Sequence, residues 1–170
     1  FGDLRSWLLA ELLWDPDQDG KRLIGEWIDG TCGAGAPFIR KYWDVEYGAR
    51  DRTKAMIGVY GSSIGDWFTA EDLVESYLLF QKALDATKND ESAHGRVEKL
   101  YASILDEAAR RYYIRKCDGA AAKRNLKWPT QDELVDELDR IGKKHKCSCT
   151  REWADFGSLI KDLRAIKPKE

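Results

Sequence analysis

Five residues near the start of the chain have the types and the spacing of a calcium-binding loop. Asp15, Asp17, Asp19, Gly20 and Glu26 match the EF-hand pattern D-x-D-x-D-G-x5-E, and an apolar stretch lies on either side. In such a loop carboxylate oxygens surround the ion, and the glycine permits a sharp turn. One interpretation is therefore a calcium site whose ligands are Asp15, Asp17, Asp19 and Glu26.

The same stretch also fits a simple joint between two helices. Pro16 is unusual at the second position of a calcium loop, Arg22 replaces the usual aliphatic residue of the eighth, and no second EF-hand pattern follows. Asp17 or Asp19 can instead cap the next helix, whose start favours negative charge. The sequence favours this capped turn, without a metal or any other cofactor, and the calcium-binding domain is the alternative.

A second set of potential metal ligands lies near the other end of the chain. His145, Cys147 and Cys149 provide three ligands within five residues, but their spacing matches no zinc pattern. We interpret the two cysteines as free thiols or as one partner of a disulfide. The cysteines at positions 32 and 117 have no neighbouring ligands in the sequence.

The apolar residues recur with helical periodicity along nearly the whole chain, and β-branched residues are few. This pattern predicts an all-α fold, an irregular bundle of about six to seven helices. Gly48 falls inside the third of these helices and could mark a bend or a break. The expected helices span about 4–14, 20–32, 37–59, 70–87 and 91–116. A sixth begins after Thr130 and ends in a Lys-rich turn, and a last one spans about 151–165.

Local signals define where several of these helices begin and how they are grouped. Thr69 and Thr130 each precede an acidic residue at the third helical position, which predicts two capping boxes. The short connection near Asn89 predicts that helices four and five form an antiparallel pair at the centre. We expect residues 1–116 to form the main bundle and residues 117–170 a C-terminal helical extension.

The first expected helix is apolar around most of its circumference, which is typical of a helix buried on most sides. This is unusual for the first helix of a small domain, and it indicates a missing neighbour. The chain starts without a Met or a signal peptide, so we expect a part of a longer protein. The apolar residues of this helix are Leu4, Trp7, Leu8, Leu9, Leu12, Leu13 and Trp14.

Charge and hydropathy exclude some classes of partner. The formal net charge is −2 and 34% of the residues are charged, so nothing draws the whole chain to nucleic acid. No apolar run reaches the length of a membrane span. Two charged clusters are interpreted as solvated faces, where side chains one helical turn apart form ion pairs. They are Asp106, Glu107, Arg110, Arg111 and Arg115, and the basic cluster Lys143, Lys144 and Lys146.

The order of several motifs is similar to a known family. The chain resembles the helical region after the catalytic barrel in a bacterial family long labelled a domain of unknown function. Characterised relatives are the family 163 glycoside hydrolases, which cut complex N-glycans at N-acetylglucosamine. The resemblance covers about 4–113 and continues more faintly to Glu152 and Trp153. Its motifs are LLAELLWDPDQD (8–19), GAGAPFIRKY (33–42), FTAEDL (68–73) and RVEKLYASILDEAARRY (96–112).

This resemblance implies a function for the parent protein and a supporting role for this chain. Residues 1–14 would be the last helix of the barrel, and the catalytic carboxylates would lie at the ends of barrel strands that this chain lacks. We therefore expect no catalytic residue and no activity from this chain alone. It would brace the catalytic barrel of a secreted, periplasmic or surface glycoside hydrolase and shape the substrate cleft. The alternative from another class is a stand-alone helical interaction module.

Tryptophans are the remaining candidates for contact with a glycan. The chain has 7 of them, and aromatic side chains combine a large apolar face with a polar end. Trp67 lies in a Gly-rich loop and is the best candidate for an exposed, substrate-binding ring, with Trp128 second. The opposite interpretation is that Trp67 packs over the start of the following helix.

Overall fold

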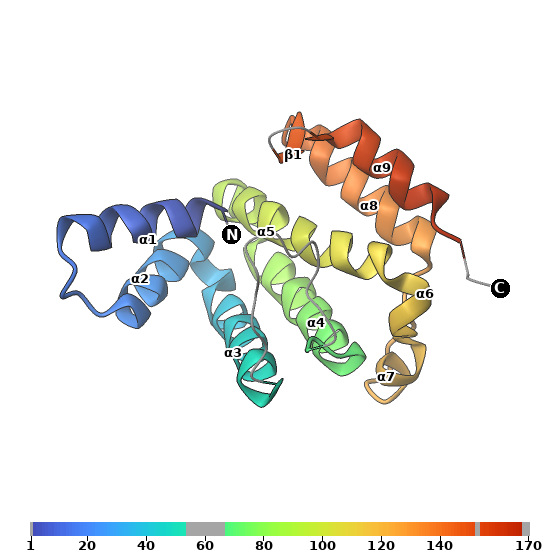
Figure 1. Cartoon of the computed structure of the whole chain (residues 1–170), viewed down its shortest axis with the longest axis horizontal. Helices are drawn as coiled ribbons and strands as arrows, with labels where there is room; N and C mark the ends of the chain where they lie inside the picture. Colours follow the sequence, from blue (N-terminus) through green and yellow to red (C-terminus); the bar gives the residue numbers. More distant parts are fainter. Residues whose placement is uncertain (1, 54–66, 152–153, 168–170) are drawn as a thin grey trace.

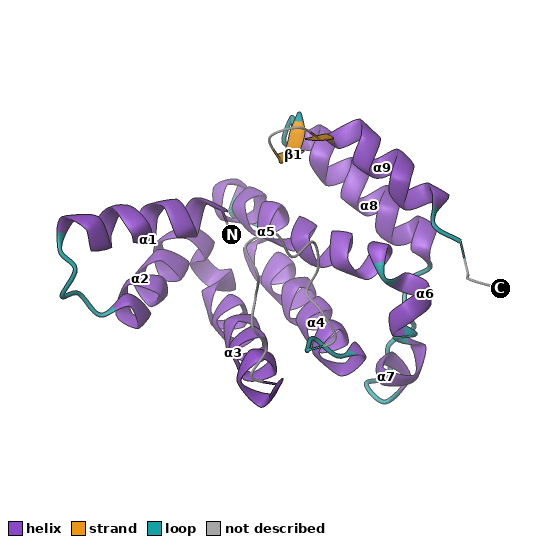
Figure 2. Cartoon of the chain, in the orientation of Figure 1, coloured by secondary structure: helices purple, strands orange, loops and turns teal. Residues whose placement is uncertain are grey.

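The structure is a computed structural model that describes residues 2–53, 67–151 and 154–167. Helices make up nearly all of these segments, which confirms the predicted all-α fold (Figure 2). The longer helices are α1 (Gly2–Trp14), α2 (Gly20–Cys32), α3 (Ala36–Thr53), α4 (Ala70–Thr87), α5 (Glu91–Arg110), α8 (Gln131–Lys144) and α9 (Phe156–Ala165). The shorter elements are η1 (Gly33–Gly35), α6 (Tyr112–Arg115), α7 (Asp118–Ala122), β1 (Cys149–Arg151) and β2 (Ala154–Asp155).

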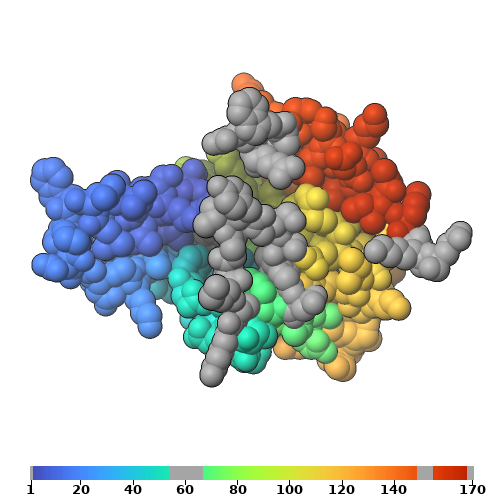
Figure 3. All heavy atoms as spheres, viewed as in Figure 1, coloured from blue at the N-terminus to red at the C-terminus, as the bar shows by residue number. Residues whose placement is uncertain are grey.

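Helices α4 and α5 form the predicted pair at the centre of the molecule (Figure 1). On one side α3 packs against α4, and on the other side α8 packs along α5 and carries α9. The α1–α2 hairpin projects at one end, as the blue part of the space-filling view shows (Figure 3). None of the helices in the described segments is both long and apolar enough to cross a lipid bilayer.

Aromatic residues join α3, α4 and α5 in the core. The Phe80 ring on α4 lies 5.0 Å from Tyr42 of α3 and 5.7 Å from Tyr101 of α5, measured between ring centroids. All three side chains are buried. Such edge-to-face and stacked pairs stabilise a core beyond the area that they bury. The apolar stripes of α3, α4 and α5 therefore meet in one continuous cluster, which also includes buried residues of α8.

Both predicted capping boxes are confirmed. Thr69 Oγ1 accepts a hydrogen bond from the Asp72 amide at 3.2 Å, and Asp72 Oδ2 accepts one from the Thr69 amide at 3.0 Å. Thr130 and Glu133 exchange the same pair of bonds at 3.2 and 2.7 Å. Each box supplies partners for amides that the first helical turn leaves unpaired. These local bonds place the first residues of α4 and α8.

The end of α5 differs from the prediction. The helix predicted to reach residue 116 ends at Arg110, and α6 is a separate short turn. Lys116 then adopts a left-handed conformation with φ of 49°, which stops helical growth. The aromatic residues Tyr112 and Tyr113 and the β-branched Ile114 have lower helix propensity than the preceding alanines. The chain can then turn so that α7 packs against α4.

The last predicted helix has a different start, and the third can be compared with the structure only as far as Thr53. The last helix was expected from residue 151 but begins at Phe156, after the short antiparallel pair of β1 and β2. Asp155 sets this start, because its carboxylate accepts the Ser158 amide at 3.0 Å. Helix α3 continues through Gly48 without interruption to Thr53, and the rest of its predicted span, 54–59, lies outside the described residues.

Candidate functional site

The acidic turn at residues 15–19 has the geometry of a capped joint. Asp19 Oδ1 accepts hydrogen bonds from the amides of Lys21 at 2.9 Å and Arg22 at 3.4 Å. Asp15 Oδ1 accepts one from the Asp17 amide at 3.2 Å. Both carboxylates therefore bind backbone N–H groups of the turn, and Asp19 is the N-cap of α2.

The fourth carboxylate of the calcium pattern is directed along α2. Glu26 forms an ion pair with Arg22 one helical turn away. Within the described segments, no group of three or more His, Cys, Asp or Glu side chains is placed to hold a metal ion. Binding of calcium by the four carboxylates of the pattern would require those of Asp15, Asp19 and Glu26 to leave their present partners.

We predict that Asp19→Ala lowers the free energy of unfolding by about 1 kcal/mol, because the substitution removes the α2 cap. Denaturant unfolding with added calcium and with a chelator measures this loss, and the same loss is expected in both. Asp17→Ala is the matched control and should change the value by less than about 0.5 kcal/mol. A loss that appears only with calcium, or a calcium-dependent change in Trp14 and Trp27 fluorescence, would favour the metal site instead.

Helix α1 presents large apolar side chains to solvent. Leu4 is buried and Trp7 and Leu8 pack partly against the core, so one side of the helix is covered. Leu9, Leu13 and Trp14 are 59%, 76% and 90% exposed. We call these three residues the α1 outer face. The missing neighbour expected from the sequence would have to cover this face.

The two tryptophans singled out in the sequence have different surroundings. Trp67 is half-buried, and its ring contacts the buried Phe68 ring edge-on at 5.7 Å between centroids. It thus lies beside the Thr69 cap of α4, and the loop before it, 61–66, lies outside the described residues. Trp128 is only 5% exposed, so the prediction of an exposed ring is wrong for this residue. It packs against Tyr77, with 5.1 Å between ring centroids.

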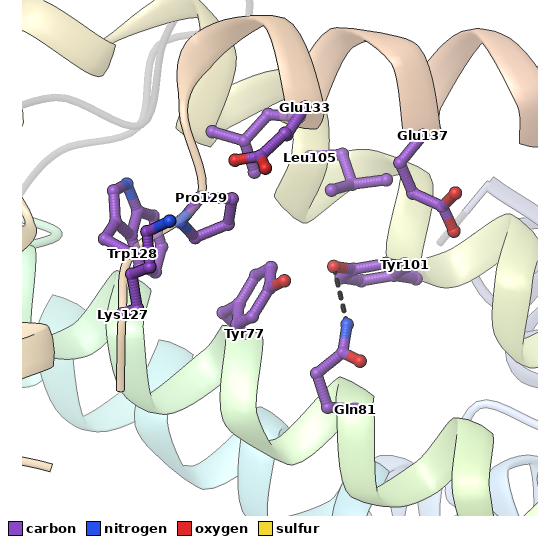
Figure 4. A pocket seen from close by; sticks show the side chains of 10 residues that line it. Tyr77, Gln81, Tyr101, Leu105, Lys127, Trp128, Pro129, Glu133 and Glu137 are labelled. Atoms are coloured by element: carbon purple, nitrogen blue, oxygen red, sulfur yellow. Dashed lines mark hydrogen bonds between the residues drawn. The ribbon is translucent and has the colours of Figure 1, made fainter. Parts of the chain in front are cut away.

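Trp128 also lines a hollow of about 400 Å³ between α4, α5 and α8. This volume is within the range of small-molecule sites, roughly 300–1,000 Å³. Figure 4 shows side chains from the three helices and from the connector before α8 around one open space. We call it the tyrosine hollow, and it is lined by Tyr77, Gln81, Tyr101, Leu105, Lys127, Trp128, Pro129, Glu133, Leu134 and Glu137.

Hydroxyl and amide groups point into the tyrosine hollow from α4 and α5. The hydroxyls of Tyr77 and Tyr101 are directed toward one another, and Gln81 Nε2 donates to the Tyr101 hydroxyl at 2.8 Å (Figure 4). Burial raises the pKa of both tyrosines above the ordinary value. Both hydroxyls therefore keep their protons and remain hydrogen-bond donors.

Two carboxylates of α8 complete the lining, and each has its own partner. Glu133 Oε2 accepts from the Thr130 amide at 2.7 Å and the Thr130 hydroxyl at 3.0 Å, and these bonds hold the pKa of Glu133 below its usual value. Glu137 binds Arg140 through two bonds of 2.7 and 2.8 Å. The carboxylate of Glu137 is therefore paired with a cation, whereas that of Glu133 is hydrogen-bonded to the neutral Thr130.

A buried ion cluster beside the hollow fixes α8 against α5. Glu98 of α5 is 2% exposed and contacts Lys144 Nζ at 2.6 Å, His145 Nε2 at 2.9 Å and an Arg140 nitrogen at 3.0 Å. Burial alone would raise the pKa of Glu98, but hydrogen bonds from these three side chains outweigh it and hold the pKa at about 2. Lys144 is thus part of an interhelical contact and not only of a solvated face.

The cysteines at positions 32 and 117 have the surroundings of core residues. Cys32 and Cys117 are buried, and burial raises the pKa of their thiols to about 11 and about 12. Of the three potential metal ligands near the other end of the chain, His145 binds Glu98 and Cys147 is exposed. Buried thiols with raised pKa values behave as small apolar residues in a core.

The residues that the structure describes thus form an all-α arrangement that includes an exposed apolar helix face and a polar hollow. A family model described as "Domain of unknown function (DUF4838)" matches residues 1–44. The match covers α1, α2, η1 and the first half of α3, which include the α1 outer face. No curated protein sequence and no solved structure matches the chain.

The residue pattern alone did not indicate the hollow as a site. Tyr77 and Tyr101 lie on the apolar stripes of the fourth and fifth predicted helices, and Glu133 is the acidic residue of the second predicted capping box. The two tyrosines did indicate a polar site, because a tyrosine on a buried stripe must direct its hydroxyl toward a polar partner or solvent. The sequence could not show that two such hydroxyls meet beside Glu133 and Glu137.

Proposed function

We propose that this chain is a non-catalytic helical domain that packs through the α1 outer face against another domain of the same protein. One observation carries this proposal: Leu9, Leu13 and Trp14 are mostly exposed together on one helix. Contiguous large apolar side chains on a surface are typical of an interaction site. The family match supports the proposal, because residues 1–44, which include this face, are similar to a domain of unknown function.

The proposed neighbour is a (β/α) barrel of a bacterial glycoside hydrolase that acts on N-acetylglucosamine-containing glycans. The resemblance over about 4–113 supports this choice, because it makes α1 the last helix of that barrel. Helices of such a barrel pack one side against the strands. The chain would then brace the barrel and shape its substrate cleft, and the catalytic carboxylates would belong to the barrel. The parent protein would be secreted, periplasmic or attached to the cell surface.

A double substitution in the α1 outer face should have different effects in this chain alone and in the parent protein. Leu13→Glu with Trp14→Glu should change the free energy of unfolding of this chain alone by less than about 0.5 kcal/mol, because both side chains are already exposed. In the parent protein the same change should split a single unfolding transition into two, because charged side chains cannot be buried against the neighbour. Differential scanning calorimetry of both proteins measures this.

Ile114→Glu is a matched control, because Ile114 is 65% exposed and lies on α6, outside the part that the family model matches. It should leave the parent protein's single transition unchanged. A parent protein whose unfolding is equally insensitive to the Leu13 and Trp14 changes would refute the docking role. An assay of the intact parent protein on complex N-glycans then tests the glycosidase assignment separately.

The second candidate function is a stand-alone module that binds a separate protein through the same α1 outer face. The same exposed residues support it, but it needs no barrel. The DNA upstream of the Phe1 codon distinguishes the two. An upstream coding region with alternating strands and helices supports the glycosidase domain, whereas a start codon directly before Phe1 supports the stand-alone module.

A further inference from the structure

We infer that the tyrosine hollow binds a neutral, polyhydroxylated ligand, namely one sugar residue, free or at the end of a glycan. The hollow lies outside the part matched by the family model and apart from the α1 outer face. The inference therefore does not depend on the docking role. It rests on the charge, the hydrogen-bonding groups and the rings that face the open space.

The charges of the lining favour a neutral ligand over an ionic one. Glu137 is neutralised by two bonds from Arg140, and Glu133 is stabilised by two bonds from Thr130. Lys127 adds a positive charge on the connector side of the hollow. An organic cation would meet this ammonium group, and an anion would meet the two carboxylates. Lys127 is opposite in sign to Glu133, and Arg140 is opposite in sign to Glu137, so these four side chains present no net charge that would attract an ion of either kind.

The polar groups of the lining suit a ligand that carries several hydroxyls. Tyr77 supplies a hydroxyl that stays protonated, Gln81 supplies an amide, and Glu133 and Glu137 supply carboxylate oxygens. A hydroxyl can donate and accept at once, so a polyol can pair with donors and acceptors on different sides of the hollow. A ligand with only acceptors or only donors would leave some of these groups without partners, at a cost in affinity.

The aromatic side chains give the hollow an apolar wall beside these polar groups. Tyr77 lies between Trp128 and Tyr101, with 5.1 and 5.8 Å between the ring centroids. The contacts fix the three rings against one another, and Pro129 adds a further apolar surface from the connector. Binding sites for small molecules combine such rigid apolar walls with a few placed polar groups. The C–H face of a sugar ring fits the apolar wall, and its hydroxyls fit the other side.

Titration of the nitrogen-15-labelled chain with single sugars tests the inference. Glucose, galactose, mannose and N-acetylglucosamine are the neutral probes, and choline and acetate are the charged ones. We expect at least one sugar to shift the indole N–H signal of Trp128 in a saturable way, while choline and acetate leave it unchanged. The signal is assigned with Trp128→Phe. An asparagine-linked glycan as a further probe distinguishes a bound glycan terminus from a free sugar.

The variant Tyr77→Phe removes one hydroxyl and keeps the ring, so it should weaken the sugar affinity by about tenfold. Tyr113→Phe is the matched control, because Tyr113 is a half-buried tyrosine on α6 outside the hollow, and it should leave the affinity unchanged. Two-dimensional spectra verify that both variants are folded. The inference fails if none of the sugars gives a saturable shift, if choline or acetate binds more tightly, or if Tyr77→Phe leaves the sugar affinity unchanged.

Discussion

Glu98→Gln is expected to lower the free energy of unfolding at neutral pH by about 2–3 kcal/mol. Glutamine has nearly the same shape, so the loss comes from the charge and not from packing. Glu98 is almost fully buried, whereas Arg140 and Lys144 are about half exposed and can return to water when their partner is lost. Denaturant unfolding of both proteins at neutral pH measures the difference, which reports the contact between α5 and α8.

The same substitution should change how stability depends on pH. The pKa of Glu98 is held at about 2, below its ordinary value of 4.5, so the folded state binds this proton less readily than the unfolded state. Its contribution is therefore fully present above the unfolded pKa and is lost as the pH falls from about 4.5 toward about 2. The difference in stability between the natural chain and Glu98→Gln should shrink over this acid range.

Glu71→Gln is the control for an ordinary carboxylate, because Glu71 forms an exposed ion pair with Lys123 at 3.3 Å. An exposed pair contributes roughly 0–1 kcal/mol, so this variant should lose little stability. If Glu98→Gln were no more harmful than Glu71→Gln, the buried cluster would not hold α8 against α5. A difference from the natural chain that stayed constant down to about pH 2 would show that the charge of Glu98 is not the cause.

The sequence predicted those features of the fold that depend on neighbouring residues. The bounds of α2 were correct, and Thr69 and Thr130 were recognised as caps, because a cap and an apolar stripe depend on residues three or four positions apart. Glu98 could not be recognised in this way. Its partners Arg140 and Lys144 lie 42 and 46 residues away, and only the packing of α8 brings them to it.

The charged cluster at the end of α5 shows a second limit of local patterns. Its residues were predicted to form ion pairs on a solvated face, and Arg110 with Asp106 is such an exposed pair. Glu107 and Arg115, however, keep only 6% and 9% of their side chains exposed, so the prediction is wrong for them. The spacing along a helix predicts which residues can pair. It does not predict that the helix is interrupted at Arg111, nor that the pair of Glu107 and Arg115 is buried.

The tyrosine hollow also depends on packing between helices that are distant in the sequence. Three residues of the tyrosine hollow had a sufficient local explanation, because Tyr77 and Tyr101 fit apolar stripes and Glu133 fits a cap. Their common position depends on how α8 and its connector cross α4 and α5. Because the Glu98 cluster fixes α8 on α5, weakening that cluster is also expected to disturb the hollow that Glu133 and Glu137 line.

Gly142→Ala is expected to destabilise the chain by about 1–3 kcal/mol, although alanine favours helices more than glycine does. A Cβ at position 142 of α8 would lie 2.1 and 2.2 Å from two ring carbons of Phe156, the first residue of α9. Phe156 is 9% exposed, so its ring has little room to move without shifting the start of α9. Hydrogen exchange of the α9 amides, together with denaturant unfolding, should show faster opening of that helix in the variant.

Gly30→Ala provides a control with the opposite sign. Gly30 lies within α2, and no heavy atom comes within 4 Å of an added Cβ there, so the better helix propensity of alanine should stabilise by about 0.5–1 kcal/mol. If Gly142→Ala stabilised the chain as Gly30→Ala does, the close packing of the Phe156 ring on Gly142 would be contradicted. If the contact is right, the double variant Gly142→Ala with Phe156→Leu should recover part of the loss. A smaller side chain at position 156 leaves room for the new methyl group, so the two substitutions should not be additive.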